Sequence, residues 1–133
     1  MIVVDSSVWI DFLNESATPQ ATELQSLIRS EQAVALTGLI LTEVLQGLSS
    51  ESEADVTADL LESFPILEMN PADYVEAARL YRAARKQGVT ISNKNDVQIA
   101  VPCIREDAWL LHRDSDFDLL ATVSDLKIWQ PPA

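Results

Sequence analysis

The fold is decided by the opening stretch Met1-Ile-Val-Val-Asp5-Ser-Ser-Val-Trp9-Ile-Asp-Phe-Leu13. Three β-favouring residues run without a polar break into Asp5, and apolar residues then recur at helical spacing. This pattern predicts a buried strand, a tight turn and an amphipathic helix. An unbroken apolar strand is typical of a parallel sheet covered on both faces, where ligands collect at the carboxyl ends of strands. Asp5 occupies such an end, and it can equally be an N-cap that accepts a backbone N–H from the first helical turn.

The composition is that of a compact globular protein. The 133 residues are 47% hydrophobic and include only three glycines, which predicts a single domain over residues 1–133 with one core. The chain begins on the predicted strand and has no apolar run long enough to cross a bilayer, so we expect a cytoplasmic protein without a signal peptide or membrane contact. The single cysteine, Cys103, excludes an internal disulfide, and its apolar neighbours predict a small core residue.

The formal net charge of −12 argues against broad, non-specific binding to nucleic acid. It is compatible with an enzyme that gathers carboxylates around divalent cations, because a bound metal reverses the local field. A basic protein partner would also suit this charge. The charge therefore lowers the expectation of nucleic-acid chemistry without removing it.

Apolar runs and turn signals alternate along the rest of the chain. Short apolar runs predict strands over residues 33–36, 66–69, 109–112 and 126–129. Helical periodicity predicts helices over residues 21–29, 39–48, 51–64, 71–87 and 94–107, with a short helix following residues 113–118. Pro102 lies inside the last of the long helices and is expected to bend it or to remove a hydrogen bond. This alternation predicts a three-layer α/β/α sandwich around a mostly parallel sheet.

Four carboxylates stand out from the ordinary acids of the surface. Glu43 is the only charged residue between residues 32 and 50, Asp96 starts an apolar helix, and Asp114 follows a predicted strand just as Asp5 does. Each has an ordinary explanation when it is taken alone. Glu43 would belong to a narrow solvent-facing stripe, Asp96 would be a helix-terminal charge, and Asp114 with Asp116 would serve as turn and capping acids.

Considered together, the four acids indicate a metal site. Two follow strands and two lie where neighbouring helices could face them, so their carboxylates would repel one another unless divalent cations held them. Hard oxygen ligands suit Mg²⁺ or Mn²⁺, with a substrate phosphate completing the coordination shell. The chemistry that such a site favours is metal-assisted hydrolysis of a phosphodiester bond.

The motifs around these acids resemble those of a known family, the PIN-domain ribonucleases, and within it the VapC-like toxins of bacterial toxin–antitoxin pairs. The similarity covers nearly the whole chain, in the family's order. Its four acidic motifs correspond to Ile2-Val-Val-Asp5-Ser-Ser-Val-Trp-Ile10, Leu41-Thr-Glu43-Val-Leu45, Asp96-Val-Gln-Ile-Ala100 and Leu110-Leu-His-Arg-Asp114-Ser-Asp-Phe117.

This resemblance implies a PIN-like fold and an endoribonuclease that depends on Mg²⁺ or Mn²⁺ and leaves 5′-phosphate and 3′-hydroxyl ends. It also implies an RNA substrate, a homodimer and a cognate antitoxin, and the negative charge suggests that a basic segment of the antitoxin occupies the acidic pocket. The residues to which it assigns roles are Asp5, Glu43, Asp96 and Asp114 as metal ligands, Asp116 as a further acid of the site, and Ser6 or Ser7 for orienting water or phosphate.

One predicted helix, over residues 71–87, carries both a cationic and an aromatic face. Arg79, Arg82 and Lys86 share one face and are candidates for contact with an RNA backbone, or else they form a solvated face whose charges suit a helix C-terminus. Tyr74 and Tyr81 lie on another face, and we expect them to serve core or dimer packing rather than base stacking.

Two other functions agree with parts of the sequence. A serine hydrolase would combine Ser6 or Ser7 with His112, but the chain has no Gly-x-Ser-x-Gly elbow and its only histidine lies in an apolar strand, where we expect a packing role. The alternative to the nuclease is a catalytically silent PIN-like binding module that forms a complex with a partner protein.

Overall fold

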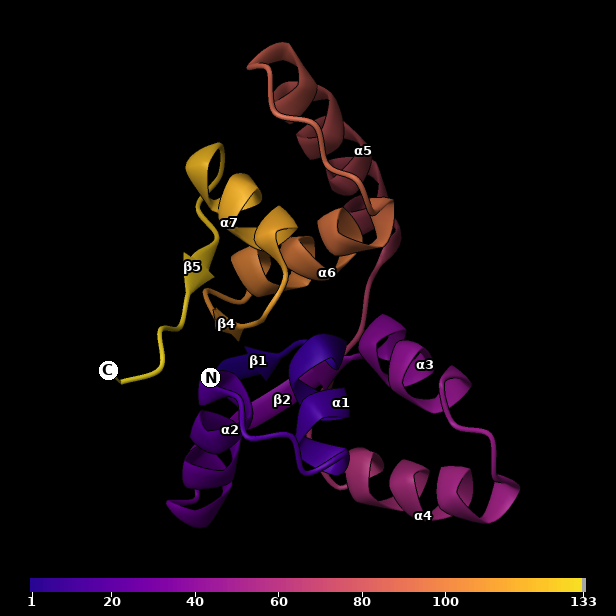
Figure 1. Cartoon of the computed structure of the whole chain (residues 1–133). Helices are drawn as coiled ribbons and strands as arrows, with labels where there is room; N and C mark the ends of the chain where they lie inside the picture. Colours follow the sequence, from indigo (N-terminus) through magenta and orange to yellow (C-terminus); the bar gives the residue numbers. More distant parts are fainter. Residues whose placement is uncertain (133) are drawn as a thin grey trace.

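The computed structural model describes residues 1–132, and within that range it contains five strands and seven helices (Figure 1). The strands are β1 (Ile2–Val4), β2 (Val34–Thr37), β3 (Ile66–Leu67), β4 (Trp109–Leu111) and β5 (Lys127–Ile128). The helices are α1 (Ser6–Leu13), α2 (Pro19–Arg29), α3 (Gly38–Gln46), α4 (Glu51–Glu62), α5 (Pro71–Lys86), α6 (Lys94–Arg105) and α7 (Ser115–Thr122). Each predicted strand and long helix is present, with its ends shifted by at most two residues. The short helix expected after residues 113–118 begins earlier, at Ser115, because Asp114 caps it.

The strands form one parallel sheet in the order β3-β2-β1-β4-β5. Strand β1 lies at its centre, where Val3 pairs with Ala35 of β2 and with Leu110 of β4. All residues of β1 and β2 are buried, as a sheet covered on both faces requires. Strands β2 and β3 follow β1 on one side of it, and β4 and β5 lie on its other side.

The helices cover the two faces of the sheet in two groups. Helices α1 to α4 gather on one side, where α1 packs against α2 and α3, and α3 packs against α4 (Figure 1). Helices α5 to α7 gather on the other side, where α6 packs against both α5 and α7 (Figure 1). Right-handed crossovers explain the division, because connections that run in opposite directions along a sheet place their helices on opposite faces. The predicted three-layer α/β/α sandwich is thus confirmed.

Capping residues at both ends of α5 fix where this long helix begins and ends. Asn70 and Asp73 form a reciprocal capping box at its start, and Pro71 occupies its first turn. Gly88 follows its C-terminus with a φ of +79°, a left-handed conformation that favours glycine. Asp73 also ties α5 to α6, since the Nε of Arg105 donates to its Oδ1 at 3.0 Å.

The core contains the largest buried side chains of the chain. Trp9 and Phe117 are fully buried, and the ring centroids of Trp9 and Phe64 lie 5.3 Å apart. Cys103 is a buried core residue, as predicted. Pro102 lies inside α6, where it offers no N–H to the helix, and α6 nevertheless continues to Arg105. Among residues 1–132, no helix combines the length and apolar character that a bilayer crossing demands.

Candidate functional site

The candidate site lies between β1 and β4, where the direction in which successive strands are added to the sheet changes. The connections that leave β1 and β4 depart toward opposite faces, so the carboxyl ends of these neighbouring strands form the switch point at which open α/β sheets bind their ligands. Asp5 follows β1 directly, and its backbone N–H donates to Leu111 at the end of β4 at 2.9 Å. Asp114 comes just after β4, at the start of α7. Two of the predicted acids are thus brought together by strand order alone.

Asp5 caps α1 and still keeps one oxygen free. Its Oδ2 accepts hydrogen bonds from the backbone N–H of Ser7 at 3.1 Å and from the Ser7 hydroxyl at 2.6 Å. Its Oδ1 is buried and has no hydrogen-bond partner within the described residues. Burial raises the pKa of Asp5, although the Ser7 bonds act in the opposite direction. The predicted cap is therefore confirmed, and the second oxygen is available to a ligand.

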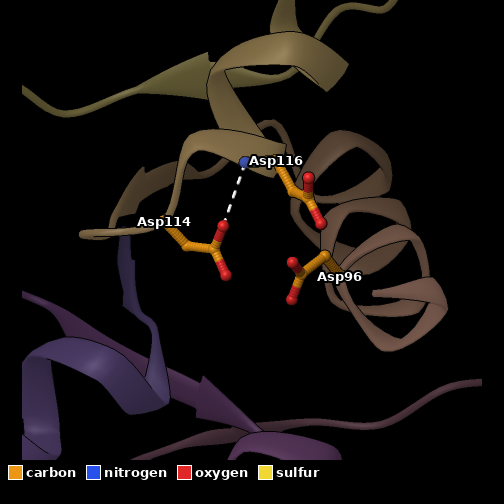
Figure 2. Close-up of side chains that lie close together, drawn as sticks. All are labelled: Asp96, Asp114 and Asp116. Atoms are coloured by element: carbon orange, nitrogen blue, oxygen red, sulfur yellow. Dashed lines mark hydrogen bonds between the residues drawn. The ribbon is translucent and has the colours of Figure 1, made fainter. Parts of the chain in front are cut away.

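Asp96, Asp114 and Asp116 form a tight group, which we call the acid cluster. One carboxylate oxygen from each lies within 4.8 Å of the others, and the three side chains point into the same space (Figure 2). Asp96 comes from the first turn of α6. Asp114 is the N-cap of α7 and accepts the backbone N–H of Asp116 at 3.0 Å (Figure 2). The N-terminal ends of α6 and α7 thus supply the acid cluster.

Asp116 and Asp96 have pKa values shifted in opposite directions by their surroundings. Burial acts to raise the pKa of Asp116, but the backbone N–H of Asn93 and the Ser92 hydroxyl, both at 2.9 Å, hold it below its ordinary value. Burial and the nearby carboxylates of Asp114 and Asp5 instead raise the pKa of Asp96 to about 8. Asp116 is therefore held as a carboxylate, whereas Asp96 keeps its proton at neutral pH unless a positive charge replaces it.

Glu43 lies beside the acid cluster on α3. It is half-buried, and its Oε1 accepts a hydrogen bond from the Ser6 hydroxyl at 3.2 Å. Burial and the nearby Asp5 carboxylate raise the pKa of Glu43. The two hydroxyls that sequence analysis proposed for orienting water or phosphate, Ser6 and Ser7, thus each donate to a carboxylate of the site.

The residues that hold the acids in position were not predicted from the sequence. Ser92 and Asn93, which donate to Asp116, lie between the helices predicted over residues 71–87 and 94–107, in a segment to which the sequence pattern gave no role. His112 was expected only to pack, yet its Nδ1 accepts the backbone N–H of Asp114 at 3.0 Å. Its Nε2 therefore carries the proton and donates to Asp118 at 3.0 Å. The polar pair directly before the Asp96 helix was the available signal for Ser92 and Asn93.

The donor set fits a hard divalent cation. Asp5 Oδ1 and Asp96 Oδ2 are buried oxygens without a hydrogen-bond partner in the described part of the chain, and the three carboxylates of the acid cluster converge. Such oxygens are costly to bury unless they are paired. A divalent cation would supply that pairing, and all-carboxylate ligands suit Mg²⁺ or Mn²⁺.

The three residues of the predicted cationic face of α5 have different surroundings in the structure. Arg79 is exposed and paired with Glu76, one turn earlier on the same helix. Lys86 is exposed in the last turn, and Arg82 lies over a shallow pocket between α5 and α6 together with Tyr74 and Tyr81. The three cations are therefore not equivalent.

Comparison with known proteins agrees with this geometry. The family model for the PIN domain matches residues 2–123. The chain is 34% identical over 129 residues, 96% of each chain, to VapC ribonuclease Mb1587 of Mycobacterium bovis and to Ribonuclease VapC11 of Mycobacterium tuberculosis. Among solved structures, VapBC2 from Rickettsia felis bound to a promoter DNA fragment matches 98% of this chain and 100% of that chain, with a TM-score of 0.76 and 18% identity. FitAcB from Neisseria gonorrhoeae matches 98% of each chain, with a TM-score of 0.76 and 22% identity.

Proposed function

The chain belongs to the PIN-domain family, and we propose that it is a metal-dependent endoribonuclease that acts as the toxin of a toxin–antitoxin pair. The observation that carries this proposal is the acid cluster, with the unpartnered oxygens of Asp5 and Asp96, at the switch point of the sheet. Relatives named as ribonucleases, at 34% identity over nearly their whole length, support RNA as the substrate.

In this proposal Asp5, Glu43, Asp96 and Asp114 hold Mg²⁺ or Mn²⁺, and Asp116 completes the acidic site. When bound, the cation supplies Lewis acidity for the activation of water and neutralises charge on the scissile phosphate. Other residues of the chain position these carboxylates and set their protonation states in the absence of substrate.

The supporting contacts have separate tasks. The Ser7 hydroxyl, 2.6 Å from Asp5 Oδ2, fixes the Asp5 carboxylate and leaves its other oxygen without a hydrogen-bond partner among the described residues. Ser92 and Asn93 keep Asp116 ionised. Below pH 8 a cation must displace a proton from Asp96, so cation affinity should fall as the pH drops below about 8.

The test is RNA cleavage by the purified chain with Mn²⁺ or Mg²⁺, compared with Asp5→Asn and Asp96→Asn. Both variants should lose cleavage while keeping the circular dichroism spectrum of the wild type, because the isosteric amide preserves shape but removes the ligand charge. Asp59→Asn, on the exposed surface of α4, is the matched control and should cut RNA normally. Full Mn²⁺-dependent activity in either site variant would overturn the proposal.

We further propose a cytoplasmic homodimer that is silenced by a cognate antitoxin. The structural matches to proteins named VapBC2 and FitAcB support a protein partner, and the net charge of −12 favours a partner segment that is basic. Undiminished antitoxin affinity after the joint substitution Glu43→Gln and Asp114→Asn would contradict binding of that segment at the acids. Mapping of RNA ends after brief expression, beside an Asp5→Asn control, separates the nuclease from a silent binding module, which would leave no new ends.

A further inference from the structure

A shallow pocket between α5 and α6 combines aromatic and cationic side chains. Its volume is about 310 Å³, and we call it the tyrosine pocket. Its small apolar lining residues are Ala77, Ala78 and Val97. The larger side chains that line it are Tyr74, Tyr81, Arg82, Arg85, Lys94 and Gln98. In a chain with 21 acidic residues, none of the described residues that line this pocket is Asp or Glu.

The cations of the tyrosine pocket differ from most others in the chain. Four of the nine Lys and Arg residues, including Arg79 and Arg105, lie in ion pairs with carboxylates. Arg82, Arg85 and Lys94 are exposed, and none has a carboxylate within 4.0 Å among residues 1–132. Three cations without a carboxylate partner in the described part of the chain therefore lie at one place in an acidic protein, which favours binding of an anionic ligand there.

The aromatic ring of Tyr81 is at the centre of this group. The guanidinium of Arg85 lies 5.7 Å from the ring centroid of Tyr81, and the ammonium of Lys94 lies 5.6 Å from it. The Tyr81 side chain is half-buried against the core, so its ring is held in place, whereas Tyr74 is 55% exposed. A fixed ring with two cations close to it is suited to a ligand that presents both a flat base and phosphates.

Helix α6 separates the tyrosine pocket from the acid cluster. Lys94 and Asp96 both lie in its first turn but about half a turn apart around its axis, so they face opposite flanks. The width of one helix, about 10 Å, therefore lies between the pocket and the acids. The N-terminus of α6 adds a partial positive charge between them. A strand that reaches the acid cluster can continue over this helix end into the pocket.

We propose that the tyrosine pocket binds the single-stranded RNA substrate beside the cleavage site, with a base stacked on Tyr81 and phosphates bound by Arg82, Arg85 and Lys94. This inference rests on the proposed nuclease function and adds the residues that hold the strand. A single strand fits better than a duplex, because only unpaired bases are free to stack on an aromatic side chain. Arg82 alone of the predicted cationic face belongs to this site.

The test is the affinity of the full chain for a fluorescein-labelled, mixed-sequence, 12-nucleotide single-stranded RNA, measured by anisotropy in EDTA at several salt concentrations. Arg85→Ala should make the slope of log affinity against log salt shallower by about 0.7, the value for one phosphate contact on a single strand. The matched control is Arg29→Ala, which removes an exposed cation without a carboxylate partner among residues 1–132, from the last turn of another helix, and should leave the slope unchanged. Tyr81→Leu should weaken binding about tenfold without a change in slope, and Tyr81→Phe should stay within about twofold of the wild type.

The possible outcomes separate this proposal from the proposed nuclease function. Equal slopes for Arg85→Ala and Arg29→Ala, or equal affinities for Tyr81→Leu and Tyr81→Phe, would overturn the RNA pocket even if the protein cuts RNA. A binding defect in Arg85→Ala and Tyr81→Leu would support the pocket even if Mn²⁺ induced no cleavage. Unchanged RNA binding with an altered oligomeric state or antitoxin affinity would assign the pocket to a protein contact and would also overturn the proposal.

Discussion

Asp96 should make the cation-free protein less stable as the pH rises. Its pKa is about 8 in the folded protein, against an ordinary value of 3.8. Between these values the folded state holds a proton that the unfolded chain has released, so the free energy of unfolding falls as pH increases. At about 1.4 kcal/mol per pH unit, this one group makes the protein about 4 kcal/mol less stable at pH 8 than at pH 5.

The assay is the thermal midpoint of wild type and Asp96→Asn in EDTA at pH 5 and pH 8. For a chain of this length about 3 °C corresponds to 1 kcal/mol, so the wild type should lose on the order of 10 °C more than the variant. Mn²⁺ at about 100 times its Kd should return about 2.7 kcal/mol to the wild type at pH 8. The variant should gain much less, because one ligand charge is missing.

Asp59→Asn serves as the control here too, because it removes an exposed carboxylate and should keep the pH dependence of the wild type. The reasoning is refuted if wild type and Asp96→Asn show the same loss of thermal midpoint between pH 5 and pH 8. An equal gain from Mn²⁺ in both proteins would refute the placement of Asp96 in the cation site.

Removal of single groups elsewhere should have effects of different sizes. Arg105→Ala leaves the buried Asp73 carboxylate without its ion-pair partner and should lower the free energy of unfolding in urea by about 2 kcal/mol. Gly88→Ala places a Cβ at a φ of +79° and should cost about 1 kcal/mol in the same experiment. Ser7→Ala removes the hydroxyl that positions Asp5 and should slow RNA cleavage about tenfold with little change in stability.

Matched substitutions give these effects a reference. Arg29→Ala removes an unpaired, exposed arginine and should leave stability within about 0.5 kcal/mol of the wild type. Gly38→Ala introduces a Cβ that meets nothing within 4 Å, at a position without a positive φ, and should not destabilise. Ser30→Ala, at the exposed end of α2, should cut RNA at the wild-type rate. Equal losses in a test variant and its reference would contradict the role given to the test residue.

The fold could be predicted because its signals are local. The apolar strand before Asp5, Pro71 at the start of α5 and Gly88 after its end each specify their own segment. The acids at strand ends were predictable for the same reason, since parallel strands bring their carboxyl ends to one edge of the sheet. Pro102 did not end α6, because the buried packing of the helix outweighs one missing hydrogen bond.

The supporting parts of the site were not predictable because their partners are distant in sequence. The bonds from Ser92 and Asn93 to Asp116 span 24 and 23 residues, so the polar pair before α6 marks these two residues without indicating their partner. The tyrosine pocket combines Tyr81 and Arg85 of α5 with Lys94 of α6, so a single helical face could not reveal it. The i,i+3 pairing that neutralises Arg79 with Glu76 was visible in the sequence and would have separated it from Arg82.

The pairing of β1 with β4 also bears on when the proposed nuclease becomes active during its own synthesis. The pair joins Val3 to Leu110, so the candidate site needs residues from nearly the whole chain before it is complete. At about 5–20 residues per second, translation separates Asp5 from Asp114 by roughly 5–20 s. A chain made only as far as the end of α6 contains Asp5, Glu43 and Asp96 but lacks Asp114 and Asp116. We therefore expect chains truncated before β4 to show no RNA cleavage.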